Sequence, residues 1–218
     1  MDSLTDDKLF QSTRFPRRAI HELIDLPRDD LERQTARSRA VPADTQVLAA
    51  LQFYSSGSFQ WMLGQSSGMS QASVSRVITG VTDALCHLAN RTITFPVIRQ
   101  KIIDNKQAFS AIAGFPNVIG AIDCTRIPIK SPANNEEAYV NRKGVHTINV
   151  QAVCDPNMRL LDVVAKWPGS THDSFIWRSS NLHQLFEDGH LQGGWLLGML
   201  NILFTFNFCG YLVNIVKF

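Results

Sequence analysis

The hydrophobic pattern of the chain changes its period near Gly114, and this change limits the possible folds more than any other feature. Before it, from Pro42 to about residue 90, apolar side chains recur every three or four positions, which is the spacing of an amphipathic helix. After it, apolar residues come in short runs bounded by turn residues, which is typical of strands. We therefore predict a helical region over residues 42–113 and a sheet-containing region over residues 114–198.

The second region contains signals for three strands, a helix and a fourth strand. The strands are expected from Val118 to a carboxylate at Asp123, then over residues 145–154, 160–166 and 195–198. Asp155-Pro-Asn-Met forms a tight turn between the second and third strands, and a helix opens at Pro168 and runs to about Glu187. Three strands, a helix and a strand are the opening order of a ribonuclease-H-like sheet. The predicted class is an α/β (α+β) fold with an incomplete ribonuclease-H-like core behind a helical region.

A glycine turn at Gly68-Met-Ser separates two predicted helices in the first region. Their spacing is typical of a helix-turn-helix over residues 59–88, with Ser70 capping the second helix. The polar side chains at the start of that helix are candidates for contacts with the base edges and phosphates of DNA. They are Gln71, Ser73, Ser75 and Arg76. A small helical bundle with a glycine turn would give the same pattern, so both interpretations stay open.

Residues 1–41 are polar and carry both signs of charge. Six arginines fall between Arg17 and Arg39, interleaved with acidic residues. We expect a solvated, partly helical arm, and the alternative is an arm that follows the phosphates of a nucleic acid. The net charge of the whole chain is only +2, so nucleic-acid binding has to be argued from local patches.

The cysteines exclude two small-domain classes. Cys86, Cys124, Cys154 and Cys209 contain no C-x-x-C pair, which argues against a disulfide-stabilised miniprotein and against the usual zinc-ribbon spacing. The N-terminus is polar and acidic, unlike a signal peptide. We expect an intracellular protein with reduced thiols.

Residues 195–216 carry no formal charge and are long enough to span a bilayer. Three asparagines interrupt this stretch, at positions 201, 207 and 214, and a buried amide without a partner is costly in lipid. A membrane anchor is therefore the less favoured interpretation.

Two carboxylates stand where chemistry is possible. Asp123 at a strand end suits Mg²⁺, which proteins hold by one or two carboxylates, although a capping role is equally open. Asp173 lies three residues after Ser170, the spacing of a capping box. The same position also places Asp173 and His172 at the open edge of the predicted sheet beside the third strand. There, His172 would bind a phosphate or relay a proton.

A cationic loop precedes the second strand. Arg142 and Lys143 in this loop are candidates for phosphate contacts, and the alternative is an ordinary exposed turn.

Six motifs between Arg33 and Gly198 together resemble the PIF/Harbinger transposase family of DDE endonucleases, specifically its harbinger transposase-derived, nuclease-like members in vertebrates. In chain order they are TQVLAALQFYSSGSFQ, GMSQASVSR, IGAIDC, AYVNRKGVH, VCD, and WPGSTHDS followed by WLLG. The resemblance implies a ribonuclease-H-like core and phosphodiester cleavage with a divalent metal cation, Mg²⁺ or Mn²⁺. It implies that Asp123 and Asp173 are catalytic residues and metal ligands, that DNA is the partner, and that the protein is found in the nucleus and also the cytoplasm. A protein partner for nuclear import or DNA targeting is a further expectation.

The sequence departs from the family after Gly198. Where the family has Leu-Leu-Gly-Asp, this chain has Met199 in place of the acid, and a thioether does not replace a carboxylate towards Mg²⁺. An apolar tail over residues 199–218 then replaces the rest of the family's sequence. The resemblance therefore implies a C-terminally truncated or altered form that no longer cleaves DNA. The alternative is a non-enzymatic module that binds DNA or recruits a protein through the helix-turn-helix.

Overall fold

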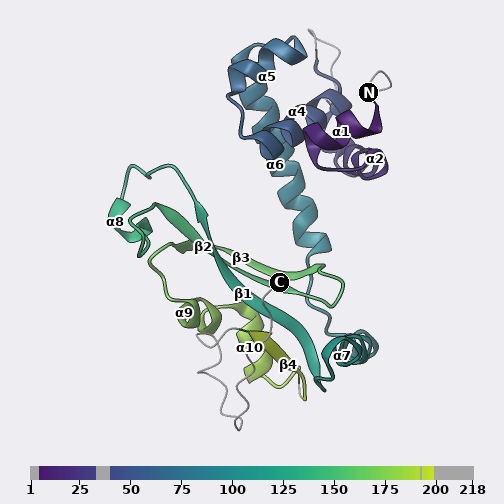
Figure 1. Cartoon of the computed structure of the whole chain (residues 1–218), viewed down its shortest axis with the longest axis vertical. Helices are drawn as coiled ribbons and strands as arrows, with labels where there is room; N and C mark the ends of the chain where they lie inside the picture. Colours follow the sequence, from purple (N-terminus) through teal and green to yellow (C-terminus); the bar gives the residue numbers. More distant parts are fainter. Residues whose placement is uncertain (1–4, 33–39, 192, 199–218) are drawn as a thin grey trace. The chain divides into compact units, whose positions relative to one another are not determined.

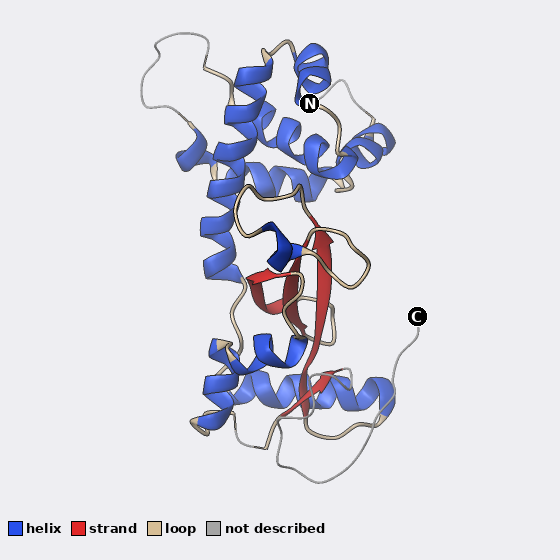
Figure 2. Cartoon of the chain, turned by 90° about the vertical axis from the view of Figure 1, so that its left-hand side faces the viewer, coloured by secondary structure: helices blue, strands red, loops and turns tan. Residues whose placement is uncertain are grey.

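The computed structural model describes residues 5–32, 40–191 and 193–198 (Figure 1). The chain divides into two compact units, Met1–Thr92 and Ile93–Phe218. The described part of the first unit contains helices and no strands, while the sheet lies in the second unit (Figure 2). The change of period near Gly114 therefore falls inside the second unit, between its first helix and its first strand.

The first unit contains six described helices. They are α1 (Asp6–Thr13), α2 (Arg17–Asp25), α3 (Arg28–Leu31), α4 (Ala43–Ser56), α5 (Gln60–Ser67) and α6 (Gln71–Thr92). Val47 of α4 and Val81 of α6 are buried in one hydrophobic core. The apolar positions that repeat along the sequence at helical spacing form this core.

The N-terminal segment differs from the solvated arm that we expected. Leu9 of α1, Ile20 and Ile24 of α2, and Leu31 of α3 are buried in the same core as α4 and α6. Ile20 and Ile24 lie four residues apart, so one face of a short helix buries both while its arginines stay outside. The high overall polarity of this segment conceals a narrow apolar stripe, and that stripe is sufficient to fold it onto the unit.

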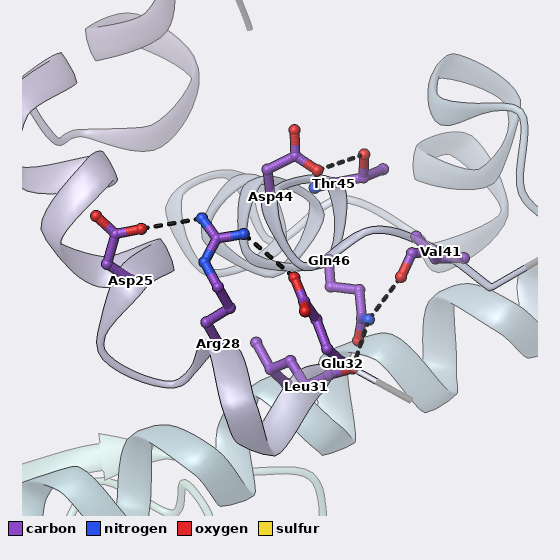
Figure 3. A network of polar contacts seen from close by, with 8 residues as sticks. All are labelled: Asp25, Arg28, Leu31, Glu32, Val41, Asp44, Thr45 and Gln46. Atoms are coloured by element: carbon purple, nitrogen blue, oxygen red, sulfur yellow. Dashed lines mark hydrogen bonds and ion pairs between the residues drawn. The ribbon is translucent and has the colours of Figure 1, made fainter. Parts of the chain in front are cut away.

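Polar contacts connect α3 to α4 (Figure 3). The side-chain amide of Gln46 donates to the backbone oxygen of Leu31 at 3.1 Å and to that of Val41 at 2.8 Å. Arg28 pairs with Asp25 at 2.9 Å and with Glu32 at 3.2 Å, all on the surface, where ion pairs contribute little. The partly buried Gln46 amide is thus the stronger of these links.

Helix, glycine turn and helix occur where we predicted them. Gly68 ends α5 with a φ of 67°, a left-handed conformation that glycine adopts without strain. The backbone N–H of Ser73 donates to Ser70 Oγ at 3.2 Å, so Ser70 caps α6 as expected. Leu63 of α5 packs with Val74 and Ile78 of α6 in a small separate core.

The second unit is built around a four-stranded sheet. Its elements are α7 (Arg99–Ala113), β1 (Val118–Pro128), α8 (Glu136–Tyr139), β2 (Thr147–Cys154), β3 (Leu160–Pro168), α9 (Asp173–Arg178), α10 (Asn181–Glu187) and β4 (Trp195–Gly198). The strand order is β3-β2-β1-β4. β1 is antiparallel to β2, β2 is antiparallel to β3, and β4 is parallel to β1. This α/β arrangement confirms the predicted fold class and is consistent with a ribonuclease-H-like domain.

Two elements of this unit differ from the prediction. β1 does not end at Asp123 but continues to Pro128, because Thr125 to Pro128 pair with the first half of β2. The helix expected up to Glu187 is two helices, α9 and α10. Ser180 lies at the break, where its hydroxyl accepts the backbone N–H of His183 at 3.1 Å and caps a new helix.

The core of the second unit lies between the sheet and its C-terminal helices (Figure 1). Trp177 of α9 is fully buried with Ile122 of β1 and Val153 of β2, and Leu182 of α10 and Leu196 of β4 complete the cluster. This packing fixes α9 against the middle of the sheet.

Among the residues that the structure describes, no helix is long and apolar enough to cross a membrane. Met199 and the apolar tail predicted over residues 199–218 lie outside the described residues.

Candidate functional site

Asp123 lies in the middle of β1. Its strand neighbour on one side is Ala152 of β2, and the described pairing with β4 reaches the preceding residue, Ile122, opposite Gly198. The side chain is exposed, and its Oδ1 accepts the backbone N–H of Cys124 at 2.8 Å. The carboxylate is thus presented on the sheet beside the point where the described part of β4 ends.

Asp173 is the first residue of α9, and its carboxylate is held by the sheet. The amide Nδ2 of Asn149 donates to Asp173 Oδ1 at 2.8 Å, and the guanidinium of Arg126 lies 3.9 Å from the same oxygen. The Asp173 side chain is 18% exposed and Asn149 is fully buried. A partly buried hydrogen bond to a charged group is stronger than one between neutral groups, so these contacts fix the start of α9.

Arg126 and Asn149 also hold the loop that precedes Asp173. The two residues are opposite each other on β1 and β2. Arg126 Nε donates to the backbone oxygen of Gly169 at 3.1 Å, and Asn149 Nδ2 donates to that of Thr171 at 3.0 Å. We call Arg126, Asn149 and Asp173 the loop clamp, because together they fasten residues 169–173 to the sheet.

His172, not Ser170, caps α9, so the predicted capping box is wrong. His172 Nδ1 accepts the backbone N–H of Ser174 at 3.3 Å and lies 2.9 Å from Ser174 Oγ. Ser170 instead donates its hydroxyl to the backbone oxygen of Ala138 at 2.6 Å. Because Nδ1 is the acceptor, the neutral imidazole carries its proton on Nε2, and the side chain is exposed.

The two predicted acids lie on opposite faces of β1. Side chains alternate along a strand, so Asp123 points away from the face that carries Cys124 and Arg126. Cys124 packs against the core of the unit, and Arg126 reaches Asp173 on that same face. The structure therefore does not bring the Asp123 and Asp173 carboxylates together on one surface.

The Cys124 thiol in β1 interacts electrostatically with both the Asp123 and the Asp173 carboxylate. Burial raises the pKa of the Cys124 thiol to about 12, and the negative charges of Asp173 and Asp123 contribute to the rise. A thiol with so high a pKa stays protonated near neutral pH and does not act as a metal ligand or nucleophile.

The described residues do not complete a metal site. Asp123 offers the hard oxygen donors that Mg²⁺ prefers, whereas the Asp173 carboxylate lies on the other face of β1, where its Oδ1 accepts a hydrogen bond from Asn149. Across the described ranges, three or more His, Cys, Asp or Glu side chains nowhere form a group that could hold a metal ion. We therefore derive no catalytic step through a metal from these residues.

Arg142 and Lys143 lie exposed at the tip of a turn before β2. Asn141 Oδ1 accepts the backbone N–H groups of Lys143 at 2.8 Å and of Val145 at 3.2 Å, which fixes the turn. Below it, His146 Nε2 lies 2.8 Å from Glu136 Oε1. The two cationic side chains thus extend outward from an ordered turn.

In the first unit, the predicted DNA-contacting residues differ in how far they extend outward. Gln71 and Arg76 are exposed, although Arg76 Nε donates back to the helix at Ala72 O, 3.1 Å away. Ser73 and Ser75 are half-buried, and Ser73 belongs to the cap, with its hydroxyl 3.0 Å from that of Ser70. Gln71 and Arg76 are therefore the more accessible of the four.

Sequence reasoning missed two members of the loop clamp, Arg126 and Asn149. A signal for Asn149 existed, because it is a polar residue that alternates with Ile148 and Val150 in the strand TINVQAVC. A polar residue inside a strand is tolerated when a partner satisfies it, and here the partner comes from the first turn of a helix 24 residues later.

Comparison with known proteins supports the resemblance that the sequence motifs indicate. Residues 122–198 match the model of the DDE superfamily endonucleases. This part of the chain is therefore similar to that superfamily. It is 44% identical over 198 residues to "Putative nuclease HARBI1" of Rattus norvegicus and of Homo sapiens, covering 91% of this chain and 57% of each relative. "Protein ALP1-like" of Arabidopsis thaliana is 29% identical over 198 residues, covering 87% of this chain and 48% of that protein.

These matches confirm the resemblance to harbinger transposase-derived nucleases. This chain spans about half the length of the curated relatives that it matches. No solved structure matches it.

Proposed function

We propose that this chain is a transposase-derived nuclease that acts on DNA, with Asp123 as the acid from its first strand. The observation that carries this proposal is the exposed carboxylate of Asp123 in β1, inside the region that matches the endonuclease family. The vertebrate relatives named as nucleases, at 44% identity, support the same reaction class. The reaction would be hydrolysis of a phosphodiester bond.

A divalent cation, Mg²⁺ or Mn²⁺, is the cofactor in this proposal. When bound, it would supply positive charge to the scissile phosphate. Asp123 is the described residue best suited to bind it. Asp173, which we predicted as a second ligand, is better suited to the loop clamp, where it positions the exposed imidazole of His172 beside the sheet.

DNA is the proposed substrate, and the exposed cations are its proposed contacts. Arg142 and Lys143 would meet phosphates beside the sheet, and the Nε2–H of His172 is a further donor for a phosphate oxygen. In the first unit, Gln71 and Arg76 would reach base edges or phosphates, with Ser73 and Ser75 beside them.

The test is cleavage of a supercoiled plasmid and a labelled duplex by the full chain with Mg²⁺, Mn²⁺ or EDTA. Met199 in place of an acid argues for a loss of cleavage in this form. The nuclease proposal instead expects cleavage that occurs only with metal and that falls roughly 100-fold or more in Asp123→Asn, the scale at which removal of a group that stabilises transition-state charge is felt. Glu137→Gln, an exposed acid in α8, is the matched control and should cleave normally. A chain that cuts no DNA with either metal would overturn the nuclease proposal.

The second candidate is a non-enzymatic module that binds DNA or recruits a protein through α5 and α6. The incomplete set of metal ligands in the described residues favours it. Under this proposal the full chain binds a duplex without cutting it. Arg76→Gln should then weaken binding and flatten its salt dependence, since one phosphate contact is lost. Arg91→Gln, an exposed arginine near the other end of α6, is the control and should bind as the unsubstituted chain does.

We further propose that the protein is found in the nucleus and in the cytoplasm, with a protein partner that assists nuclear import or DNA targeting. The sequence contains no long run of Lys and Arg that would serve as an import signal. Imaging of a fluorescently tagged full chain tests this, and exclusion from the nucleus would contradict it.

A further inference from the structure

Phe175 presents a large aromatic ring on the surface of α9. It is 49% exposed, whereas the next two residues of the helix, Ile176 and Trp177, are fully buried. Those two side chains dock α9 on the sheet, and the exposed part of the Phe175 ring takes no part in that packing. A single exposed apolar residue is ordinary in a folded protein, so its neighbours decide whether this one has a function.

Trp167 of β3 supports the Phe175 ring from one side. The two ring centroids are 5.1 Å apart and the ring planes meet at 85°, which is an edge-to-face pair. Trp167 itself lies opposite Asn149 of the loop clamp in the sheet. The exposed ring is therefore held by a residue of the sheet and not only by its own helix.

Three side chains that can donate hydrogen bonds to a phosphate lie next to this aromatic pair, and all three are exposed. Lys166 Nζ lies 5.3 Å from the centre of the Trp167 ring. His172 and Arg178 lie three residues before and three residues after Phe175, which makes them its neighbours along the surface of α9. We call Lys166, Trp167, His172, Phe175 and Arg178 the α9 site.

Positive charge prevails in the stretch that forms this site. Asp173 is the one acid in the sequence of residues 163–180, which also contains Lys166 and Arg178. The Asp173 carboxylate is 18% exposed, and the guanidinium of Arg126 lies 3.9 Å from it. The charge of this acid is thus partly offset within the loop clamp, and the exposed charges of the stretch are complementary to phosphate.

We propose that the α9 site binds an unpaired nucleotide of DNA, whose base stacks on the exposed ring of Phe175. Lys166 and Arg178 contact the phosphates on either side of that base, and the Nε2–H of His172 is a further donor to them. Every base has an aromatic face, but a duplex covers these faces by stacking, so such a site favours single-stranded DNA. This inference rests on DNA as the ligand in the proposed function, and it names the form of DNA that is bound.

The α9 site lies on the face of the sheet opposite to Asp123. Arg126 and the start of α9 are on one face of β1, and the Asp123 carboxylate is on the other. A substitution in the α9 site should therefore change the affinity for DNA and leave the proposed metal-binding acid intact. Binding measured in EDTA, where no metal-dependent cleavage occurs, separates this inference from the nuclease proposal.

Fluorescence anisotropy of a labelled single strand and of the matching duplex, with the full chain in EDTA, tests the site. Phe175→Leu keeps an apolar side chain at a half-exposed position, so it should fold normally by circular dichroism. It should weaken binding of the single strand roughly 5-fold or more, the effect of losing one stacked base, and leave duplex binding nearly unchanged. Phe10→Leu is the matched control, because Phe10 is 50% exposed on α1, and it should bind as the unsubstituted chain does.

Two further variants test the stacking and the phosphate contacts separately. Phe175→Trp enlarges the aromatic surface and should bind the single strand at least as tightly as the unsubstituted chain. Lys166→Gln should reduce the salt dependence of single-strand binding by about 0.7 in the slope of log K against log salt, the value for one phosphate contact. Lys101→Gln, an exposed cation of α7 outside the site, should leave that slope unchanged.

Three results would overturn the inference. One is a full chain that does not bind a single strand at low salt, whatever it does to a duplex. Another is single-strand binding that Phe175→Leu leaves intact. The third is a loss in Phe175→Trp as large as that in Phe175→Leu, which would make the shape of the side chain, and not stacking, the cause. Metal-dependent cleavage in any of these cases would leave the nuclease proposal standing, whereas the expected binding without cleavage would retain the α9 site alone.

Discussion

The Nδ2 amide of Asn149, fully buried in the sheet, donates to Asp173 Oδ1 at 2.8 Å and so joins β2 to the first residue of α9. The same nitrogen donates to the Thr171 backbone. This one side chain therefore fastens two residues of the loop 169–173, Thr171 and Asp173, to the sheet. In this structure, the motif WPGSTHDS holds the start of α9 against the sheet.

Replacing Asn149 by Ala should destabilise the second unit by about 2–3 kcal/mol, because it leaves a partly buried carboxylate and a carbonyl without their donor. Urea unfolding followed by tryptophan fluorescence measures this, since Trp167, Trp177 and Trp195 all lie in that unit. Asn90→Ala, on the surface of the first unit, should change the free energy of unfolding by less than about 0.5 kcal/mol. A similarly small loss for Asn149→Ala would show that the clamp does not hold.

The two acids should respond differently to truncation. Asp173→Ala should cost about 1.5–3 kcal/mol in a metal-free buffer, because its hydrogen bond to Asn149 is lost. Asp123→Ala, at an exposed position, should cost about 0.5 kcal/mol or less. Urea unfolding in EDTA checks both. Stabilisation by Asp173→Ala would instead indicate a carboxylate kept under strain for ligand binding.

Gly169 should tolerate no side chain. A Cβ there would meet Thr147 Oγ1 and would lie 2.6 Å from the backbone oxygen of Thr147 and 2.8 Å from that of Tyr139. Gly169→Ala should therefore destabilise by about 3 kcal/mol, since backbone rather than a flexible side chain must move.

Gly80 is the matched control for this substitution. It lies inside α6, and a methyl group added there would have no neighbouring atom within 4 Å, so Gly80→Ala should stabilise by about 0.5–1 kcal/mol through helix propensity. Thermal unfolding of the two variants should move in opposite directions, and equal shifts would contradict the packing around Gly169.

The sequence predicted the elements of the sheet more reliably than their ends. The alternation along residues 145–154 and the Asp155-Pro-Asn-Met turn were enough for β2 and β3, and Met158 N donates to Asp155 O at 3.0 Å as such a turn requires. The sequence pattern did not predict that β1 extends beyond Asp123, because an arginine such as Arg126 usually lies on an exposed surface. Arg126 pairs with Asn149 only when β1 and β2 come together in the folded chain, and the local sequence pattern does not contain that information.

The face of β2 that meets α9 was the least predictable part of the site. Thr147, Asn149 and Gln151 are all at most 2% exposed, although their types favour the surface. Local pattern alone would assign only the apolar alternates, Ile148 and Val150, to a buried side, and Val150 is indeed buried, at 7% exposed. Only the docking of a later loop, which supplies polar partners to Asn149, makes the polar face an inner one.

Cys124 should resist alkylation. Burial and two nearby carboxylates raise the pKa of its thiol to about 12, so the reactive thiolate is scarce at pH 8. Cys86 in α6 is exposed and should react with iodoacetamide at least ten times faster. Peptide mapping by mass spectrometry of the folded chain measures both rates. Equal labelling would mean that Cys124 is not buried beside the loop clamp.

Asp162 in β3 should make stability fall as the pH rises. Burial raises the pKa of this carboxyl above its ordinary value of 3.8, against a smaller opposite effect of Gln151. The folded state therefore holds its proton more tightly than the unfolded chain does. The stabilisation is fully present below 3.8 and is lost as the pH climbs through the folded-state pKa.

Asp162→Asn removes this titration while keeping the shape of the side chain. The variant should be more stable than the unsubstituted chain at pH 7, by an amount that shrinks or reverses near pH 3.5. Urea unfolding at both pH values gives the comparison. Asp83→Asn, an exposed acid of α6, should show no such dependence. A gain that is the same at the two pH values would show that burial of the charge is not what destabilises Asp162.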